Sequence, residues 1–215
     1  MKFDILIAGV GGQGVVLASR LLATAAMDAG FHVATAETIG MAQREGSVTS
    51  HVRIGNEVCG SLIPQGTADL IIGLEPAEAA RNLRYMRKGG SLIVNEHAIV
   101  PSTQGPVKYE PDRLIGFLRD NCQDKCQSMI SADFTRLAKD AGTYKAANVA
   151  MIAAAAGAGL LPFSEEYLWG VLEKLIPEKH RDVNRRVFDR AIESIPKDED
   201  IRTKKPSMEG CETNV

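Results

Sequence analysis

A short apolar run that ends in a cluster of glycines opens the chain and restricts its fold more than any other feature. The run is Phe3-Asp4-Ile5-Leu6-Ile7-Ala8, followed by Gly9-Val10-Gly11-Gly12-Gln13-Gly14. It indicates a strand buried on both faces, as in the centre of a mainly parallel sheet. From Val15 to Ala29 apolar residues surround most of a helical circumference and stop at Gly30, which is typical of a buried helix with a glycine cap. The chain therefore begins with a strand, a tight turn and a packed helix.

The turn matches the G-x-G-x-x-G spacing of dinucleotide-binding loops. Its candidate cofactor-binding residues are Gly9, Gly11, Gly12, Gln13 and Gly14, joined by Glu37 at the end of the next predicted strand, 32–37. Such a loop exposes backbone N–H groups at the N-terminus of a helix and leaves room for a phosphate. The same glycines would also let the turn pack closely or let a partner subunit approach. The motif alone leaves both interpretations open.

The sequence after Glu37 departs from the classical dinucleotide fold. Residues 40–46 are polar and irregular where a crossover helix would be expected, and alternating apolar residues follow from Val48 to Ile54. After Gly55-Asn56, a second alternating segment from Val58 to Ile63 completes a predicted antiparallel hairpin. We therefore predict a mixed sheet, with the hairpin standing apart as an extension.

Strands and helices alternate through the rest of the chain. Strands are predicted at 69–73, 91–95 and 127–131, and helices at 75–87, 111–121, 133–141, 145–161, from Ser164 onward, and at 183–195. The alanine-rich helix at 145–161 allows neighbouring backbones to approach closely, so we place it in the interior. The predicted fold class is α/β, with three α/β/α layers, a Rossmann-like start and a mixed, mainly parallel sheet.

The predicted domain covers residues 1–196 and is followed by a flexible charged tail at 197–215. The tail has few apolar residues, so burial cannot offset the entropy lost on ordering it. The whole chain of 215 residues, 45% of them hydrophobic, has the size and apolar content of one soluble domain.

Charge and targeting signals exclude several classes of protein. The net charge is −2 and Lys and Arg are scattered among acidic residues, which predicts no binding to nucleic acid or to a membrane. The start, Met1 to Asp4, leads straight into a core strand without the apolar segment of a signal peptide or a membrane span, which predicts a cytoplasmic protein.

The cysteines and histidines provide no catalytic or metal-binding pattern. Cys59, Cys122, Cys126 and Cys211 fit neither a disulfide framework nor the usual zinc and iron–sulfur spacings, and are predicted to be reduced. The histidines, at 32, 51, 97 and 180, have no evident nucleophile or acid partner. We therefore assign no catalytic residue and no metal ligand to this chain.

A second polar cluster, Glu37 to Gly46, contains Arg44 among glycines and hydroxyl-bearing residues. An arginine in this setting can hold a phosphate or carboxylate bidentately, or it can form a loop salt bridge with Glu45 or Glu37. Because the glycine loop and the Arg44 segment both leave the carboxyl ends of predicted adjacent strands, we expect them to lie side by side, where open α/β sheets place ligand crevices.

Several segments together resemble the gamma domain of the pyruvate and 2-oxoacid:ferredoxin oxidoreductases, and most of all the small subunit of the indolepyruvate enzymes. They are Gly9-Val-Gly-Gly-Gln-Gly-Val-Val16, Ala36-Glu-Thr-Ile-Gly-Met-Ala-Gln-Arg-Glu-Gly46, Ser50-His-Val-Arg-Ile-Gly55, Lys145-Ala-Ala-Asn-Val149 and Asn184 to Phe188. The resemblance spans about residues 3 to 195 and leaves out the tail.

The resemblance implies that this chain completes a larger complex and lies near its catalytic cavity. A large partner subunit would carry thiamine diphosphate and iron–sulfur clusters, decarboxylate an arylpyruvate such as indolepyruvate and pass electrons to ferredoxin, while coenzyme A accepts the acyl group. The isolated chain would bind none of these cofactors and would be inactive. Gly11 to Gly14 and Arg44 match family motifs that have no known catalytic role.

Two other functions remain open from the sequence. The glycine loop would suit a free-standing NAD(P)-dependent oxidoreductase, but the interruption after Glu37 and the missing acid–base pair disfavour it. A scaffold without any ligand is the third possibility.

Overall fold

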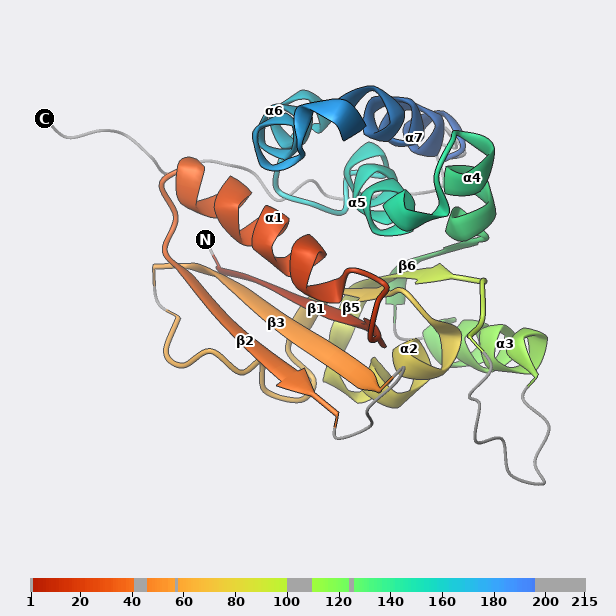
Figure 1. Ribbon diagram of the computed structural model, residues 1–215. Coiled ribbons are helices and arrows are strands. Elements are labelled where there is room, and N and C mark those ends of the chain that lie inside the picture. Colours follow the sequence, from red (N-terminus) through yellow and green to blue (C-terminus); the bar gives the residue numbers. More distant parts are fainter. Residues whose placement is uncertain (1, 41–45, 57, 100–109, 124–125, 196–215) are drawn as a thin grey trace, which may run out of the picture.

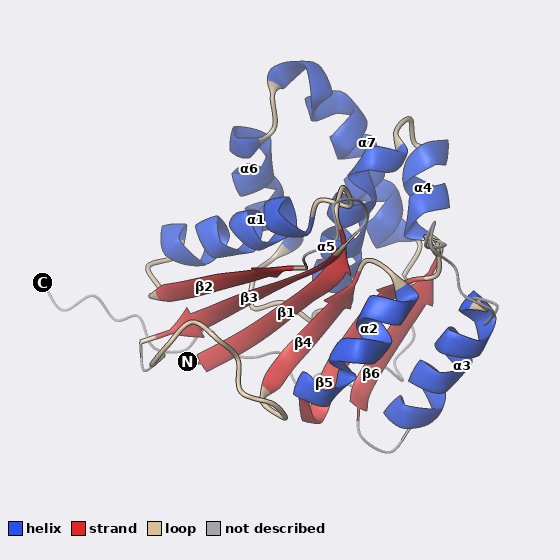
Figure 2. Cartoon of the chain, turned by 60° about the horizontal axis from the view of Figure 1, so that its bottom comes forward, coloured by secondary structure: helices blue, strands red, loops and turns tan. Residues whose placement is uncertain are grey.

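The computed structural model describes residues 2–40, 46–56, 58–99, 110–123 and 126–195. In these residues one six-stranded sheet has the order β2-β3-β1-β4-β5-β6 (Figure 2). The strands are β1 (Lys2–Val10), β2 (Val33–Ile39), β3 (Ser47–Gly55), β4 (Ala68–Gly73), β5 (Met86–Asn95) and β6 (Cys126–Ala132). β3 is antiparallel to both β1 and β2, and the pairs from β1 to β6 are parallel. The sheet is therefore mixed and mainly parallel, as predicted.

Helices cover both faces of the sheet (Figure 1). One face carries α1 (Val15–Asp28), α4 (Phe134–Asp140) and α5 (Ala147–Gly157), and the other carries α2 (Pro76–Asn82) and α3 (Pro111–Cys122). Two further helices, α6 (Glu165–Leu175) and α7 (Arg181–Glu193), pack outside α5. Short 3-10 turns lie at Leu83–Tyr85, Tyr144–Ala146 and Glu178–His180. The predicted α/β/α layers are confirmed, with α6 and α7 added outside one of them.

The central position predicted for the first strand is confirmed. β1 has β3 on one side and β4 on the other, and its residues from Ile5 to Ala8 are fully buried. Ile5 and Ile7 join the core beneath α1 and α5, whereas Leu6 and Ala8 join the core beneath α2 and α3. The continuous apolar run thus serves two hydrophobic cores, one on each face.

The alanine-rich helix α5 lies in the interior, as predicted. It is buried along its length from Asn148 to Ala156 because it packs against the sheet on one side and α6 and α7 on the other. Methyl side chains permit this close packing on several sides at once. The helix is shorter than the predicted 145–161, because a 3-10 turn precedes it and Leu160 and Leu161 follow its end.

The predicted hairpin from Val48 to Ile63 is wrong. Its first strand is β3, which lies inside the sheet between β1 and β2, and residues 58–63 form no strand. The antiparallel partners of β3 are instead β1 and β2, and Ile39 of β2 lies opposite Val48. The alternation in β3 arises because its two faces are buried against different parts of the chain. Val48, Val52 and Ile54 face α1, whereas His51 and Arg53 face the segment 58–63.

The helix predicted at 75–87 is also too long. α2 ends at Asn82, and β5 already begins at Met86, so Gly89 and Gly90 lie within a strand rather than ending a helix. Gly90 sits at a register shift against β6, and a Cβ there would lie 3.0 Å from the Ala68 carbonyl oxygen. Close backbone approach therefore explains this glycine.

Among the described residues, no helix has both the length and the apolar character needed to cross a membrane. The predicted tail at 197–215 lies outside the described residues.

Candidate functional site

The glycine loop joins β1 to α1 at the carboxyl edge of the sheet and is held in place by the protein's own side chains. Gly14 is the N-cap of α1 and adopts a left-handed conformation with φ of 79°. Asn148, at the start of α5, donates from Nδ2 to the Gly14 carbonyl oxygen at 3.2 Å and is itself buried. A Cβ at Gly14 would lie 2.4 Å from that amide nitrogen. Gly14 is therefore required for packing as well as for its backbone conformation.

Gln13 closes the loop onto the sheet. Its Oε1 accepts a hydrogen bond from the Val10 N–H at 2.9 Å, and its Nε2 donates to the Leu74 carbonyl oxygen, also at 2.9 Å. The side chain thus links the ends of β1 and β4. A Cβ at Gly9 would lie 2.8 Å from Gln13 Oε1, so Gly9 also serves the packing of this turn. The structure gives Gln13 and Gly9 structural tasks that the motif alone did not reveal.

The outer part of the loop faces open space. Gly11 and Gly12 are exposed, and a Cβ added at Gly12 would meet nothing within 4 Å. The first turn of α1 contains no acidic residue, and its glycine N-cap supplies no side-chain hydrogen bond. The positive end of a helix of 14 residues is therefore available to an anion from outside.

The described residues on either side of the Arg44 segment lie near this loop. The Gly11 N–H donates to the Gly46 carbonyl oxygen at 2.9 Å, and Gly40 N–H donates to the Ser47 carbonyl oxygen at 2.7 Å. The described ends of the segment, Gly40 and Gly46, thus lie at the same edge of the sheet as the loop. The expectation that their strands are adjacent is wrong, because β3 lies between β1 and β2. Arg44 itself lies outside the described residues.

Glu37 does not occupy the position that a dinucleotide fold would give it. β2 is two strands away from β1, at a spacing of about 10 Å rather than about 5 Å. The exposed Glu37 accepts a hydrogen bond from Ser19 Oγ on α1 at 3.3 Å. In a dinucleotide-binding protein, the strand beside the first one carries the acidic residue that binds the ribose. In this chain β3 occupies that place, so a ribose bound at the glycine loop would not meet Glu37.

Two buried carboxylates at the same edge escaped the sequence analysis. Glu75 caps α2 by accepting from the Glu78 N–H at 3.0 Å, and Glu78 accepts from Ser47 Oγ at 2.6 Å and pairs with Arg81. These contacts join the start of β3 to α2. The helix predicted from residue 75 begins close to the observed start of α2, but the pairing of Glu78 with a serine 31 residues away leaves no local signal.

Near the other end of β3, on the same face as Ser47, a buried ion pair holds the irregular segment 58–63, where the second strand of the hairpin was predicted. Arg53 Nε donates to Asp4 Oδ1 at 2.9 Å, with both side chains almost fully buried. Arg53 Nη1 donates to the carbonyl oxygens of Cys59, Gly60 and Leu62 at 3.1 to 3.2 Å. Asp4 and Arg53 are direct neighbours across β1 and β3. This part of the family motif is therefore structural.

His51 supports the same segment from the same face of β3. Its Nδ1 accepts from the Ile63 N–H at 3.2 Å, and its ring meets Tyr85 edge to face at 5.6 Å between centroids. Burial lowers the pKa of His51, and the Arg53 guanidinium lowers this pKa further, while Asp4 opposes the change. His51 is thus held in its neutral form by its surroundings.

We expect His51 to make the protein less stable in mild acid. The unfolded chain binds a proton at an ordinary histidine pKa of 6.5, whereas the folded chain resists it, so the free energy of unfolding falls as pH drops below about 6.5. One proton contributes a slope of at most about 1.4 kcal/mol per pH unit. Urea unfolding between pH 7.5 and 5 should show a smaller slope for His51→Gln than for the parent, with His180→Gln, at an exposed position, as the control for removing a histidine. Equal slopes in all three proteins would exclude this role.

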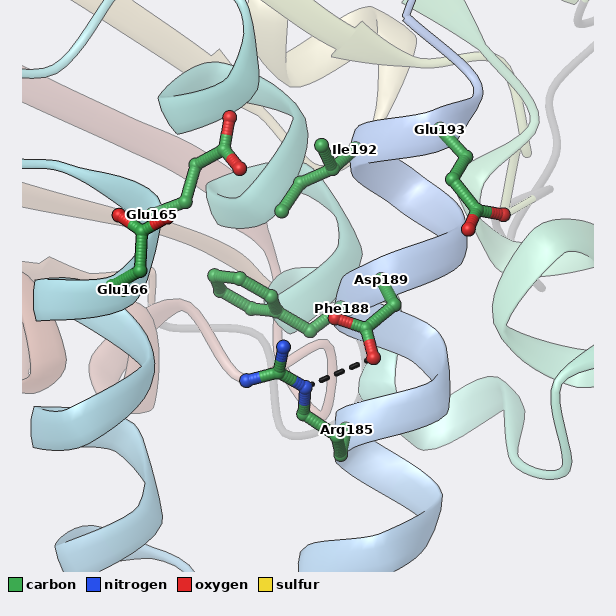
Figure 3. Close-up of a pocket in the computed structure, with 7 residues that line it drawn as sticks. All are labelled: Glu165, Glu166, Arg185, Phe188, Asp189, Ile192 and Glu193. Carbon is green, nitrogen blue, oxygen red and sulfur yellow. Dashed lines mark hydrogen bonds and ion pairs between the residues drawn. The ribbon is translucent and has the colours of Figure 1, made fainter.

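A separate cavity of about 260 Å³ lies between α6 and α7 (Figure 3). Phe188 and Ile192 form its apolar part, and its charged lining is Glu165, Glu166, Arg185, Asp189 and Glu193. Arg185 pairs with Asp189 at 2.9 Å and stacks on Trp169 at 4.8 Å, so its charge is already compensated. The excess of carboxylates makes this cavity unfavourable for a phosphate-bearing cofactor.

The fold and the glycine loop at the carboxyl edge of the sheet define a class of protein. It is a mixed α/β domain whose loop resembles a dinucleotide-binding loop but is packed by the chain's own Gln13 and Asn148. The chain belongs to the pyruvate ferredoxin/flavodoxin oxidoreductase family, whose model matches residues 4–194. Two curated relatives are both named indolepyruvate oxidoreductase subunit IorB. The protein from Archaeoglobus fulgidus is 39% identical over 91% of this chain and 98% of its own length. The protein from Thermococcus kodakarensis is 36% identical over 90% of this chain and 96% of its own length.

Solved structures share the fold. The gamma subunit of a keto/oxoacid ferredoxin oxidoreductase from Geobacter sulfurreducens aligns with a TM-score of 0.65 at 23% identity, over 89% of this chain and 96% of that one. The 2-oxoglutarate:ferredoxin oxidoreductase from Magnetococcus marinus, solved with 2-oxoglutarate, coenzyme A and succinyl-CoA, aligns with a TM-score of 0.63 at 20% identity. It covers 88% of this chain but 30% of that chain, so the fold there is part of a longer polypeptide.

Proposed function

We propose that this chain is the small subunit of a cytoplasmic 2-oxoacid:ferredoxin oxidoreductase that acts on indolepyruvate or a related arylpyruvate. The observation that carries the proposal is the near end-to-end similarity to two proteins named as indolepyruvate oxidoreductase subunits. In the proposed complex a larger subunit carries thiamine diphosphate and iron–sulfur clusters. Coenzyme A accepts the acyl group and ferredoxin accepts the electrons, and this chain completes the assembly without a redox centre of its own.

The glycine-loop edge is the part of this chain that we propose to face the larger subunit. Gly11 and Gly12 are exposed there, the positive end of α1 is not neutralised by its own first turn, and the ends of the Arg44 segment lie alongside. These features favour negatively charged groups. The edge would meet either the phosphates of coenzyme A or acidic residues of the partner, through Gly11, Gly12, Gly14 and Arg44, with Gly9, Gln13 and Glu37 shaping it.

Reconstitution tests the assignment as a subunit. The purified chain should be colourless and should not oxidise indolepyruvate alone, whereas co-expression with the larger subunit should give a complex that reduces ferredoxin in the presence of coenzyme A. Titration with NADH and NADPH is the control, because micromolar binding would favour the dinucleotide-dependent alternative. Turnover by the isolated chain, or failure to bind the larger subunit, would contradict the proposal.

We expect Arg44→Ala to weaken the complex or to raise the KM for coenzyme A while the chain stays folded. Loss of one charge-assisted contact of about 1.5 to 3 kcal/mol corresponds to roughly 10- to 150-fold in affinity. Arg44→Lys should recover part of the loss because it keeps the charge but not the bidentate geometry. Arg113→Ala, at an exposed position on α3, is the matched control. If Arg44→Ala assembles and turns over like the parent at limiting coenzyme A, Arg44 serves only its own loop.

A further inference from the structure

β2 forms one edge of the sheet, and no described residue pairs with its outer side (Figure 2). The strand pairs with β3 over all seven of its residues without a register shift. Its sequence contains neither lysine nor proline, the residues that commonly protect a strand edge. Its single charged residue, Glu37, is hydrogen-bonded to Ser19 on α1. β2 is therefore a regular edge without the usual protection against pairing with another strand.

The hydrogen bonds to β3 show which backbone groups of β2 point outward. Gly40, just after β2, donates to the Ser47 carbonyl oxygen at 2.7 Å. The His32 carbonyl oxygen, just before β2, accepts from the Gly55 N–H at 2.9 Å. In an antiparallel pair, alternate residues bond to the same neighbour, so the even-numbered residues of β2 bond to β3. The outward N–H and C=O groups belong to the odd-numbered residues, which are Val33, Thr35, Glu37 and Ile39.

Exposed apolar side chains lie at both ends of this edge. Ile39 ends β2 and is exposed, and the exposed Val16 lies one helical turn before Ser19, the residue of α1 that contacts β2. The exposed Met27 is near the end of α1, from which the chain turns back into β2 at Val33. A strand added to the edge of β2 would therefore find apolar surface to cover beside α1 as well as free backbone groups.

We propose that β2 pairs with β2 of a second copy of this chain, antiparallel and about a two-fold axis at Ala36. In this register Val33 lies opposite Ile39 and Thr35 lies opposite Glu37, so each hydrogen-bonded pair joins two outward-pointing residues. No like charges meet, whereas a shift of two residues in one direction would place Glu37 opposite its own copy. The strand is thus complementary to itself, as a two-fold interface between identical chains requires.

The same register brings the exposed apolar side chains together. Val33 and Ile39 lie on the face of the sheet that α1 covers, because they pair with core residues of β3 on that face. Residues opposite one another project to the same face, so the two copies of α1 lie on one side of the joined sheet. The end of the edge with Val16 and Ile39 in one copy then meets the end with Val33 and Met27 in the other. This contact occurs twice in the dimer.

The axis itself passes through a residue of suitable size. Ala36 bonds to β3, so across the axis it forms a non-hydrogen-bonded pair with its own copy. In such a pair the Cα atoms are about 4.5 Å apart and the side chains are at their closest. A methyl group fits this position.

A cross-link that depends on the register tests the proposal in the full chain with Cys59→Ser and Cys211→Ser. Ala36→Cys should give a disulfide between two copies on mild oxidation, because a Cα separation of about 4.5 Å lies within the disulfide range. Ala34→Cys, on the same face of β2, is the control. It would lie opposite Thr38 and about 13 Å along the strand from its own copy, so it should not cross-link. Peptide mapping of the dimer identifies the linked residues.

Thr35→Pro tests the backbone pairing without a cysteine. Proline removes an outward N–H from each copy and leaves the bonds to β3 in place, so the dissociation constant of the dimer should rise roughly 5- to 150-fold. Thr35→Ser keeps the N–H and should change the constant little. Sedimentation equilibrium measures the constant, and circular dichroism shows whether the variants are folded. If Thr35→Pro does not fold, the cross-link decides.

Three results would overturn the proposal. The parent chain could remain a monomer at the highest concentration reached, or Ala34→Cys could cross-link as readily as Ala36→Cys, which would exclude this register. Bound larger subunit could also protect Ala36→Cys from cross-linking, which would assign the edge of β2 to that subunit instead of a second copy.

Discussion

Replacing Arg53 by methionine is expected to destabilise the protein by about 3 to 5 kcal/mol. The substitution keeps an apolar stem of similar length but leaves the fully buried Asp4 carboxylate without its bidentate partner, at 2.9 and 3.3 Å. It also removes the donors that hold the carbonyl oxygens of Cys59 and Gly60. For a chain of this size, the thermal midpoint should fall by roughly 10 °C. Urea unfolding at neutral pH measures the change directly.

Two further variants distinguish the stability lost through the buried charge from the stability lost by removing any arginine. Arg87→Met breaks an ion pair with Asp69 at 2.6 Å whose side chains are 42% and 17% exposed, so it should cost no more than about 1 kcal/mol. After Arg53→Met the buried Asp4 carboxylate keeps only the half-exposed Lys2, whose Nζ lies 3.4 Å from Asp4 Oδ2. Adding Asp4→Asn removes this poorly compensated charge and should recover part of the loss. If Arg53→Met costs no more than Arg87→Met, the buried pair does not hold the segment 58–63 in place.

The layers of the fold could be predicted from the sequence because each depends on a local pattern. The apolar run of β1, the glycine turn and the alanine-rich α5 each contain the signal for their own burial. The family resemblance added the expected type of domain, and the family match supports it. The position of β3 could not be found in this way, because alternation shows that a strand has two different faces but not which strands flank it.

The misplaced hairpin and the unforeseen packing of the glycine loop share one physical cause, which is that a polar residue's partner is distant in sequence. Arg53 and Asp4 each interrupt an apolar strand, and together they could have suggested a buried pair across neighbouring strands. That pairing would have predicted β3 beside β1, and residues 58–63 would then not have been predicted as a strand. At the candidate site, Asn148 is 134 residues away from the glycine whose carbonyl it binds, so the motif could not reveal that the loop is packed from inside.

Gly14→Ala is the second substitution expected to have a large effect, at about 2 to 4 kcal/mol of destabilisation. A left-handed φ of 79° disfavours any residue with a Cβ, and here that Cβ would lie 2.4 Å from the Asn148 Nδ2. The buried Asn148 side chain must then rotate and lose its hydrogen bond to the Gly14 carbonyl oxygen, or the loop must shift. Urea unfolding of the isolated chain measures the loss without requiring the rest of the complex.

Gly12→Ala is the matched control, because its φ of 91° is equally unfavourable but its Cβ would meet nothing within 4 Å. It should cost about 1 kcal/mol. The proposal that the exposed part of the loop meets the larger subunit or an anion adds a second expectation for Gly12→Ala. The variant should impair assembly or the use of coenzyme A by more than this small loss of stability can explain. Asn148→Ala tests the contact itself, since adding it to Gly14→Ala removes the clash and the double variant should lose less than the sum of the single changes. Strictly additive losses would mean that Gly14 is needed for its backbone angle alone.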